Sequence, residues 1–226
     1  MIIPVVTCKG RLQHLTQTLP LLVEQFERTV VVDYSCPDRS GKYAAELPGV
    51  CVETVQGAQW FHKTHALNLG ADRAIDEGAT SLLFIDADTK PILGLRSLLE
   101  SIPDNMMGIT GPKTFAHSSL IGLLLVSVHK FQTVNGFDET YIGWGYEDQD
   151  MRLRLYCDAR CKPYHIPEYY FESIRHENTL RSEYQQQTLI DGAKRNQRLY
   201  RTALRERISS NPDFWCDELK QCLPYR

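Results

Sequence analysis

Short runs of β-branched and apolar residues alternate with segments of helical periodicity through the first hundred residues of this chain. The runs predict strands at residues 2–7, 29–33, 51–55 and 81–85. The periodic segments predict helices at residues 12–26, 38–47, 63–77 and 95–101. A β-α-β-α order of this kind builds an open, mostly parallel twisted sheet flanked by helices, so the fold class is α/β.

The remainder of the chain is predicted to continue this domain and then extend it. Further strands are expected near residues 107–111 and 120–127, and helices over 147–156 and much of 181–208. A chain of 226 residues with 42% hydrophobic content suits one large domain. We expect that domain to cover residues 1–180, with 181–226 forming a helical extension packed on it.

Polar segments follow three of the predicted strands, at residues 7–11, 33–38 and 86–88. In open parallel sheets, ligands bind beside the carboxyl ends of the strands. The three segments are therefore expected to meet at one rim and to form one ligand site there.

Two aspartates directly follow an apolar strand. Asp86 and Asp88 come after Leu82–Ile85, and residues two apart on an extended chain point the same way. Such a pair can hold a divalent cation that bridges carboxylate and phosphate oxygens. The alternative is a pair of turn or capping aspartates.

A glycine-flanked tryptophan precedes a cluster of acids in the second half of the chain. Trp144 lies between two glycines, and Glu147, Asp148 and Asp150 follow it. An indole offers a flat apolar face to a sugar ring, and the carboxylates can accept hydroxyl hydrogen bonds or a proton. An acidic helix N-terminus would explain the acids alone, but not the Gly-Trp-Gly sequence.

This segment, residues 134–150, resembles the acceptor-binding motif of β-1,4-galactosyltransferases and their bacterial relatives. The aspartate pair at 86–88 resembles the D-x-D of GT-A glycosyltransferases, which implies the GT-A fold of nucleotide-diphospho-sugar transferases. The resemblance implies that Asp148 is the catalytic base and that Glu147 binds a donor-sugar hydroxyl. It assigns acceptor binding to Trp144, Gly145, Gln149 and Asp150, with Gln149 standing where the family carries an aspartate.

The amino-terminal half resembles glycosyltransferase family 2. Residues 30–38 are similar to its V-D-D-x-S-x-D segment, and residues 63–70 are similar to K-x-x-A-L-N-x-G. The uracil contact stays open between Asp33 and Asp38. A solvated Lys63 and a packing or capping role for Asn68 also stay open. The nucleotide-sugar-binding residues implied are Thr7, Lys9, Arg11, Asp33, Asp38, Lys63, Asn68, Asp86 and Glu147.

Residues 173–176 resemble the M-I-R-H segment of β-1,4-galactosyltransferases. This implies that His176 is a metal ligand together with Asp88. Ser173 replaces the methionine ligand of the family, which removes a soft ligand that favours Mn²⁺ over Mg²⁺. We expect a divalent metal, Mn²⁺ in the first place, with Mg²⁺ as the alternative.

Together these resemblances imply a metal-dependent, inverting glycosyltransferase of polysaccharide biosynthesis. It would move galactose or N-acetylgalactosamine from a UDP-sugar to a hydroxyl of a saccharide or glycolipid acceptor. Three alternatives stay open: a retaining transferase of the polypeptide N-acetylgalactosaminyltransferase kind, a nucleotidyltransferase and a non-catalytic sugar-binding module.

Charge and hydropathy limit the partners and the location. A net charge of −3 argues against a nucleic-acid surface. The chain shows no signal peptide, and its longest apolar run, 120–128, is too short to span a bilayer. We expect a cytoplasmic protein with free thiols. Basic residues gather after residue 181, which predicts either a solvated helix face or contact with an anionic acceptor or the inner face of the membrane. They are Lys194, Arg195, Arg198, Arg201, Arg205 and Arg207.

Overall fold

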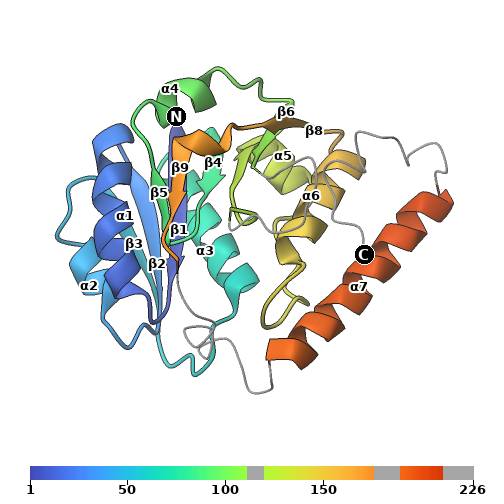
Figure 1. Ribbon diagram of the computed structural model, residues 1–226, viewed down its shortest axis with the longest axis horizontal. Helices are drawn as coiled ribbons and strands as arrows, with labels where there is room; N and C mark the ends of the chain where they lie inside the picture. Colours follow the sequence, from blue (N-terminus) through green and yellow to red (C-terminus); the bar gives the residue numbers. More distant parts are fainter. Residues whose placement is uncertain (111–119, 176–188, 211–226) are drawn as a thin grey trace.

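A seven-stranded sheet forms the centre of the molecule, with strand order β3-β2-β1-β4-β7-β6-β8 (Figure 1). The computed structural model describes residues 1–110, 120–175 and 189–210. The strands of this sheet are β1 (Ile2–Cys8), β2 (Thr29–Tyr34), β3 (Val50–Val55), β4 (Ser81–Phe84), β6 (Met106–Ile109), β7 (Leu124–Ser127) and β8 (Lys162–His165). Two further strands, β5 (Thr89–Pro91) and β9 (Phe171–Ser173), pair with each other.

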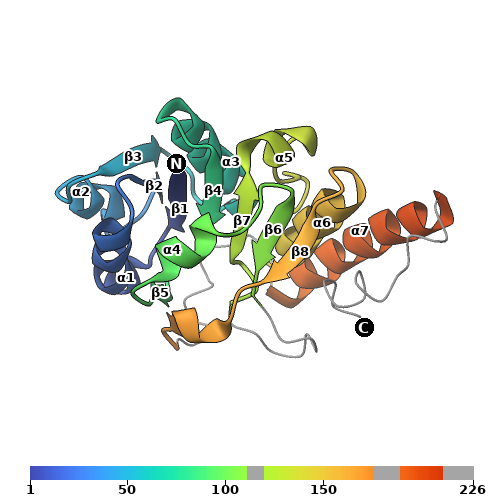
Figure 2. The same ribbon diagram turned by 90° about the horizontal axis from the view of Figure 1, so that it is seen from above.

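Helices cover both faces of the sheet, as Figure 2 shows from above. One face packs against α1, α2 and α4, and the other packs against α3, α5 and α6, with α7 beyond α6. The helices are α1 (Leu12–Gln25), α2 (Ser40–Ala44), α3 (Lys63–Asp76), α4 (Leu95–Glu100), α5 (Val128–Thr133), α6 (Glu147–Cys157), α7 (Leu189–Ser210) and the short 3₁₀ turn η1 (Glu168–Tyr170).

The predicted mostly parallel sheet is confirmed. β3, β2, β1 and β4 run parallel, and so do β6 and β8. β7 is antiparallel to both of its neighbours, β4 and β6. The parallel half therefore brings the carboxyl ends of β1, β2 and β4 to one rim, as the sequence predicted.

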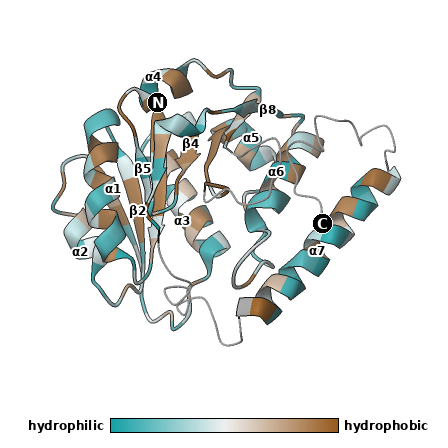
Figure 3. Cartoon of the chain, viewed as in Figure 1, coloured by the Kyte–Doolittle hydropathy of each residue, from teal (hydrophilic) through white to brown (hydrophobic). Residues whose placement is uncertain are grey.

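Two hydrophobic clusters, one on each face, hold the layers together. The strands are the most apolar part of the molecule, whereas α7 is largely hydrophilic (Figure 3). Gly70 lets α3 approach the sheet closely, because a Cβ at this position would lie 2.4 Å from Val5 Cγ1. A larger residue at 70 would push the helix away from β1.

The long elements match their predicted bounds to within a few residues, and the short ones do not. The strand expected over 120–127 begins only at Leu124, and β5, α5, β8 and β9 were not predicted. β5 and β9 have three residues each, too few for a period to be visible in the sequence. Of the predicted helix 181–208, residues 181–188 lie outside the described part. In that part, no helix is both long and apolar enough to cross a membrane.

Candidate active site

The polar segments that follow β1 and β4 meet at the carboxyl rim of the sheet. Arg11, just before α1, lies with its guanidinium 3.5 Å from Asp88 Oδ2. Both side chains are largely buried, at 12% and 17% exposure. The two segments are therefore parts of one site, as the strand order predicted.

Lys63, the first residue of α3, is the centre of this site. Its ammonium lies 3.3 Å from Asp86 Oδ1 and 3.3 Å from Glu147 Oε1. It also lies 3.5 Å from Asp148 Oδ2. Asp86 after β4 and the acids that begin α6 thus converge on the buried ammonium of Lys63, although more than 50 residues separate them in the sequence.

Asp148 has the electrostatics of a proton acceptor. Burial raises its pKa to about 7, and the negative charges of Glu147 and Asp86 raise it as well, whereas Lys63 and Arg152 lower it. A base is most effective when its pKa lies near the working pH. Asp148 can therefore take a proton from a ligand at neutral pH.

Two side-chain oxygens beside Asp148 are buried and lack a hydrogen-bond donor in the described part of the chain. They are Glu147 Oε2 and Gln149 Oε1. A buried acceptor without a donor is costly. Hydroxyl groups of a bound sugar would satisfy both.

The Trp144 loop precedes these acids and is open to solvent on one side. Gly143 and Gly145 have φ angles of +84° and +97°, which favour glycine, and an added Cβ on either would meet nothing within 4 Å. The Trp144 side chain is 37% exposed. An indole on an open loop can stack on a sugar ring.

Helix α7 supports this loop through one buried face. Asn196, which is fully buried, donates from Nδ2 to Ile142 O at 3.1 Å. Gln197 donates to the Tyr146 hydroxyl at 2.6 Å, and the ring of Tyr146 packs against Tyr200. The helix therefore holds the backbone before Trp144, at Ile142, and the side chain of Tyr146 after it.

Lys9 has a structural role. Its ammonium donates to the carbonyls of Tyr34, Ser35 and Ala58, at 2.9 to 3.1 Å. All three of its N–H groups have partners within the protein. Lys9 ties together the chain that follows β1, β2 and β3, and its contact with a nucleotide-sugar stays a prediction.

Asn68 and Asp150 are also fully engaged. Asn68 donates to Phe137 O and to Glu139, and it accepts from Phe137 N at 2.8 Å. Asp150 is 3% exposed and accepts from Arg154 Nε at 2.7 Å. Asn68 and Asp150 hold the loop that leads to Trp144, so the geometry favours the packing role for Asn68.

Asp33 is one of the residues that line an open hollow of about 600 Å³ beside the rim. Its Oδ1 accepts from Cys36 N and its Oδ2 from Gly41 N. Asp38 is exposed on the loop between β2 and α2. Thr7 is buried within β1. Of these three, only Asp33 lines the hollow.

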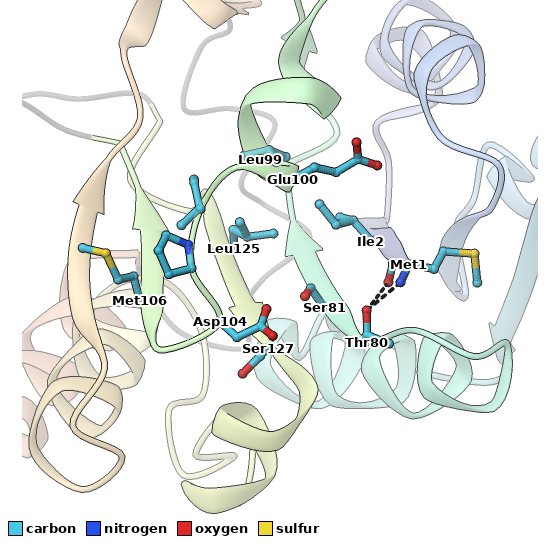
Figure 4. A pocket seen from close by; sticks show the side chains of 12 residues that line it. Met1, Ile2, Thr80, Ser81, Leu99, Glu100, Asp104, Met106, Leu125 and Ser127 are labelled. Carbon is cyan, nitrogen blue, oxygen red and sulfur yellow. Dashed lines mark hydrogen bonds between the residues drawn. The ribbon is translucent and has the colours of Figure 1, made fainter.

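Another hollow, of about 180 Å³, lies at the amino ends of the strands, opposite the carboxyl rim (Figure 4). The amino ends of β1 and β4 line it, and the amino group of Met1 donates to Thr80 Oγ1 there at 2.6 Å. None of the predicted site residues lies in this hollow, so it is separate from the rim.

The second predicted metal ligand, His176, lies outside the described residues. Ser173 and Ile174, just before it in sequence, run beside the aspartate pair: Ser173 pairs with Thr89, and Ile174 N donates to Asp88 O at 2.8 Å. Among the described side chains, no group of three or more His, Cys, Asp or Glu is placed to hold a metal ion. A cation here would need ligands from outside this set.

Arg152 and Gly122 support the site, and the sequence did not point to either. Arg152 is 1% exposed and donates to the carbonyls of Ile121 and Leu123. Gly122, between them, packs against Asp86: a Cβ on it would lie 2.3 Å from Asp86 Oδ2. The only signal in the sequence is the position of Arg152, one helical turn after Asp148.

Comparison with known proteins agrees with this geometry. Residues 109–177 match the family described as the N-terminal domain of galactosyltransferase. The chain is 30% identical to β-1,4-galactosyltransferase 4 of Rattus norvegicus and of Mus musculus, over 112 residues that cover 47% of this chain. The aligned part is 33% of the length of these relatives.

The similarity to solved structures concerns the fold. TarS of S. aureus superposes with a TM-score of 0.58 at 15% identity, covering 75% of this chain and 59% of that one. The glycosyltransferase GlyE of Streptococcus pneumoniae superposes with a TM-score of 0.51 at 15% identity, covering 74% and 45%. The chain therefore has the GT-A glycosyltransferase fold and carries a galactosyltransferase-like segment at residues 109–177.

Proposed function

We propose that this protein is a metal-dependent, inverting glycosyltransferase. It moves galactose or N-acetylgalactosamine from a UDP-sugar to a hydroxyl group of a saccharide acceptor. The observation that carries the proposal is the convergence of Asp86, Glu147 and Asp148 on Lys63 at the carboxyl rim. Asp148, the base in this proposal, lies directly beside residues that would hold a nucleotide-sugar.

Asp148 takes the proton of the acceptor hydroxyl. The oxygen of that hydroxyl then bonds to the anomeric carbon on the face opposite UDP, and the bond from this carbon to the diphosphate oxygen breaks. One displacement from the opposite face inverts the anomeric configuration. The pKa of Asp148, raised to about 7 by burial, suits this step near neutral pH.

The neighbouring side chains position the two substrates. Glu147 Oε2 accepts a hydrogen bond from a hydroxyl group of the donor sugar. This oxygen is buried and has no hydrogen-bond partner in the described part of the chain. Trp144 stacks on the acceptor sugar, and Gln149 Oε1 accepts a hydrogen bond from one of the hydroxyl groups of that sugar. Arg11 and Lys63 supply positive charge to the diphosphate.

The residues present fit a divalent cation that would be bound by protein side chains and by the diphosphate together. Asp88 offers a hard carboxylate oxygen at the rim, and His176 follows two residues after Ile174, which bonds to the Asp88 carbonyl. Mn²⁺ and Mg²⁺ complete their coordination with substrate oxygens and water. When bound, the cation would stabilise the negative charge that grows on the leaving UDP.

The test is the Asp148→Asn variant with the best donor found in a UDP-release screen. The amide keeps the shape of the side chain but cannot accept the proton, so kcat should fall at least ~10²-fold while KM changes little. Asp104→Asn is the matched control, because Asp104 is exposed and lines the hollow at the amino ends of the strands. Near-normal turnover of Asp148→Asn would rule out this base.

The anomeric configuration of the product, measured by NMR, separates the proposal from a retaining transferase. Release of pyrophosphate in place of UDP would identify a nucleotidyltransferase. Sugar binding with no UDP release in any donor and metal combination would identify a binding module.

A further inference from the structure

Helix α7 has two opposite faces of different character. Asn196 and Tyr200 are buried, at 0% and 2% exposure, and face the Trp144 loop. Four exposed basic residues follow each other at spacings of four, three and four: Lys194, Arg198, Arg201 and Arg205. At about 100° per residue, these four form one stripe on the side opposite Asn196, and it is about 16 Å long. We call this set the basic stripe.

The positive charge of the basic stripe is not neutralised by the described part of the chain. None of its four residues forms an ion pair with a described side chain, whereas Arg207, on another side of the helix, pairs with Asp158. Helix α7 carries six basic and two acidic residues, in a chain whose net charge is −3. Positive charge is therefore concentrated on this helix.

An exposed apolar side chain lies beside the stripe. Ile190 is 65% exposed, and the helical period places it next to the line through Lys194 and Arg201. An apolar side chain gains free energy in the headgroup region of a bilayer, but not against a polyphosphate surface. A straight basic stripe with an apolar residue at one end fits a helix that lies on an anionic membrane.

We propose that the basic stripe docks the protein onto an anionic lipid surface. Helix α7 lies along the membrane, and its opposite face holds the Trp144 loop through Asn196 and Gln197. The acceptor site is then kept within one helix diameter of the bilayer, where the saccharide of a glycolipid would be presented. This last step rests on the proposed function, whereas the docking itself does not.

Vesicle cosedimentation without donor or acceptor tests the docking directly. The probes are phosphatidylcholine vesicles with and without about 30% phosphatidylglycerol. We expect the protein to bind only the anionic vesicles, with binding that weakens as salt rises from about 0.05 to about 0.3 M. The variant Arg198→Gln/Arg201→Gln should bind at least ~10-fold more weakly.

The control variant Lys42→Gln/Lys162→Gln removes the same charge from exposed residues elsewhere and should bind like the wild type. Circular dichroism and thermal unfolding show that both variants fold. Failure of the wild type to bind anionic vesicles, or equal binding by both double variants, would overturn the proposal. Equal affinity for a DNA duplex would also overturn it, because the stripe would then recognise any polyanion. None of these results depends on sugar transfer, so they leave the proposed function untouched.

Discussion

A carboxylate that works as a base near neutral pH needs a pKa close to that pH. In Asp148, burial and the nearby acids raise the pKa to about 7, while Lys63 and Arg152 limit the rise. The same side chain in water would be a weaker base by about three pKa units. Its burial beside Glu147 and Asp86 is thus what gives it the pKa that the proposed base needs.

The role of Asp88 in metal binding gives a prediction at the residue scale. Asp88→Ala should abolish Mn²⁺-dependent UDP binding and leave the fold intact, because it removes a charged ligand at the rim. His176→Ala should weaken the same binding less, since a neutral ligand contributes less to holding a cation. Calorimetric titration of UDP with and without Mn²⁺ measures both. Unchanged affinity in Asp88→Ala would contradict the metal role, and an unchanged metal titration in His176→Ala would contradict that of His176.

Trp144 gives a second prediction at this scale. Trp144→Ala should impair acceptor use more than UDP binding, by on the order of 1–3 kcal/mol in kcat/KM for the acceptor, because the lost contact is apolar surface against a sugar ring. Acceptor kinetics and UDP titration measure the two effects. Trp144→Phe is the matched variant and should keep most of the acceptor use. Equal losses for acceptor and nucleotide would show that Trp144 is a packing residue.

Helix α6 connects its own acids, Glu147 and Asp148, to Asp86 after β4. Arg152 holds the carbonyls of Ile121 and Leu123, and Gly122 between them packs on Asp86. Asp86 in turn lies beside Lys63, which contacts the first turn of the same helix. One helix therefore sets the position of carboxylates that come from two distant parts of the sequence.

Gly122→Ala tests this connection. The new Cβ would overlap Asp86 Oδ2, so the carboxylate must leave its present position beside Lys63. We expect turnover to fall at least ~10-fold, since small displacements in an active site are costly, with little loss of thermal stability. Ile121→Ala is the control, because it shortens a neighbouring side chain without adding an atom next to Asp86. Normal turnover in Gly122→Ala would show that the exact position of Asp86 is unimportant.

At the scale of elements, the sequence predicts most of the fold because the long elements carry their own signal. The apolar runs of β1, β2 and β4 and the helical period of α1 and α3 are visible without any tertiary information. β5 and β9 are not visible, because each has three residues and exists only through pairing with the other. α5 is similar: its six residues follow directly from β7, and only a cap by Ser127 marks the boundary.

The candidate site, too, could be predicted from the sequence only in part. Motif position pointed to Asp86, Glu147, Asp148 and Lys63, which the structure brings together. Motif position cannot tell whether a polar side chain turns toward a ligand or toward the backbone, and both Lys9 and Asn68 turn toward the backbone. Arg152 was missed because an arginine between apolar residues of a helix usually reaches solvent.

Considered as a whole, the molecule consists of a parallel half, β3-β2-β1-β4, and a second half, β7-β6-β8, with α6 and α7 beside it. The first half carries the predicted nucleotide-binding segments, and the second half carries the loop that is predicted to bind the acceptor. Lys63 joins them, because its ammonium contacts Asp86 from the first half and the acids of α6 from the second. Its charge thus contributes both to the site and to the cohesion of the two halves.

Replacing this charge should make the stability of the whole protein depend more steeply on pH. The folded-state pKa of Asp148 lies above its unfolded value, so the contribution of this group to the free energy of unfolding is fully present below the unfolded pKa and is lost as pH rises through the folded pKa. In Lys63→Met the pKa of Asp148 rises further, because Lys63 lowers it in the wild type. Lys63→Met therefore goes on losing stability above about pH 7, which is the pKa of Asp148 in the wild type.

Urea unfolding of metal-free protein between about pH 5.5 and about pH 8.5 measures this effect. We expect Lys63→Met to be more destabilised at the higher pH by about 1–2 kcal/mol, the free energy of one to one and a half pKa units. Lys63→Arg keeps the charge and is the matched control: it should lose some stability from altered packing, but its dependence on pH should follow the wild type. Parallel curves for Lys63→Met and wild type would show that the ammonium does not hold Asp148 in its ionised form. A steeper curve for Lys63→Met alone would show that one buried charge sets the protonation state of the base and also joins the two halves of the molecule.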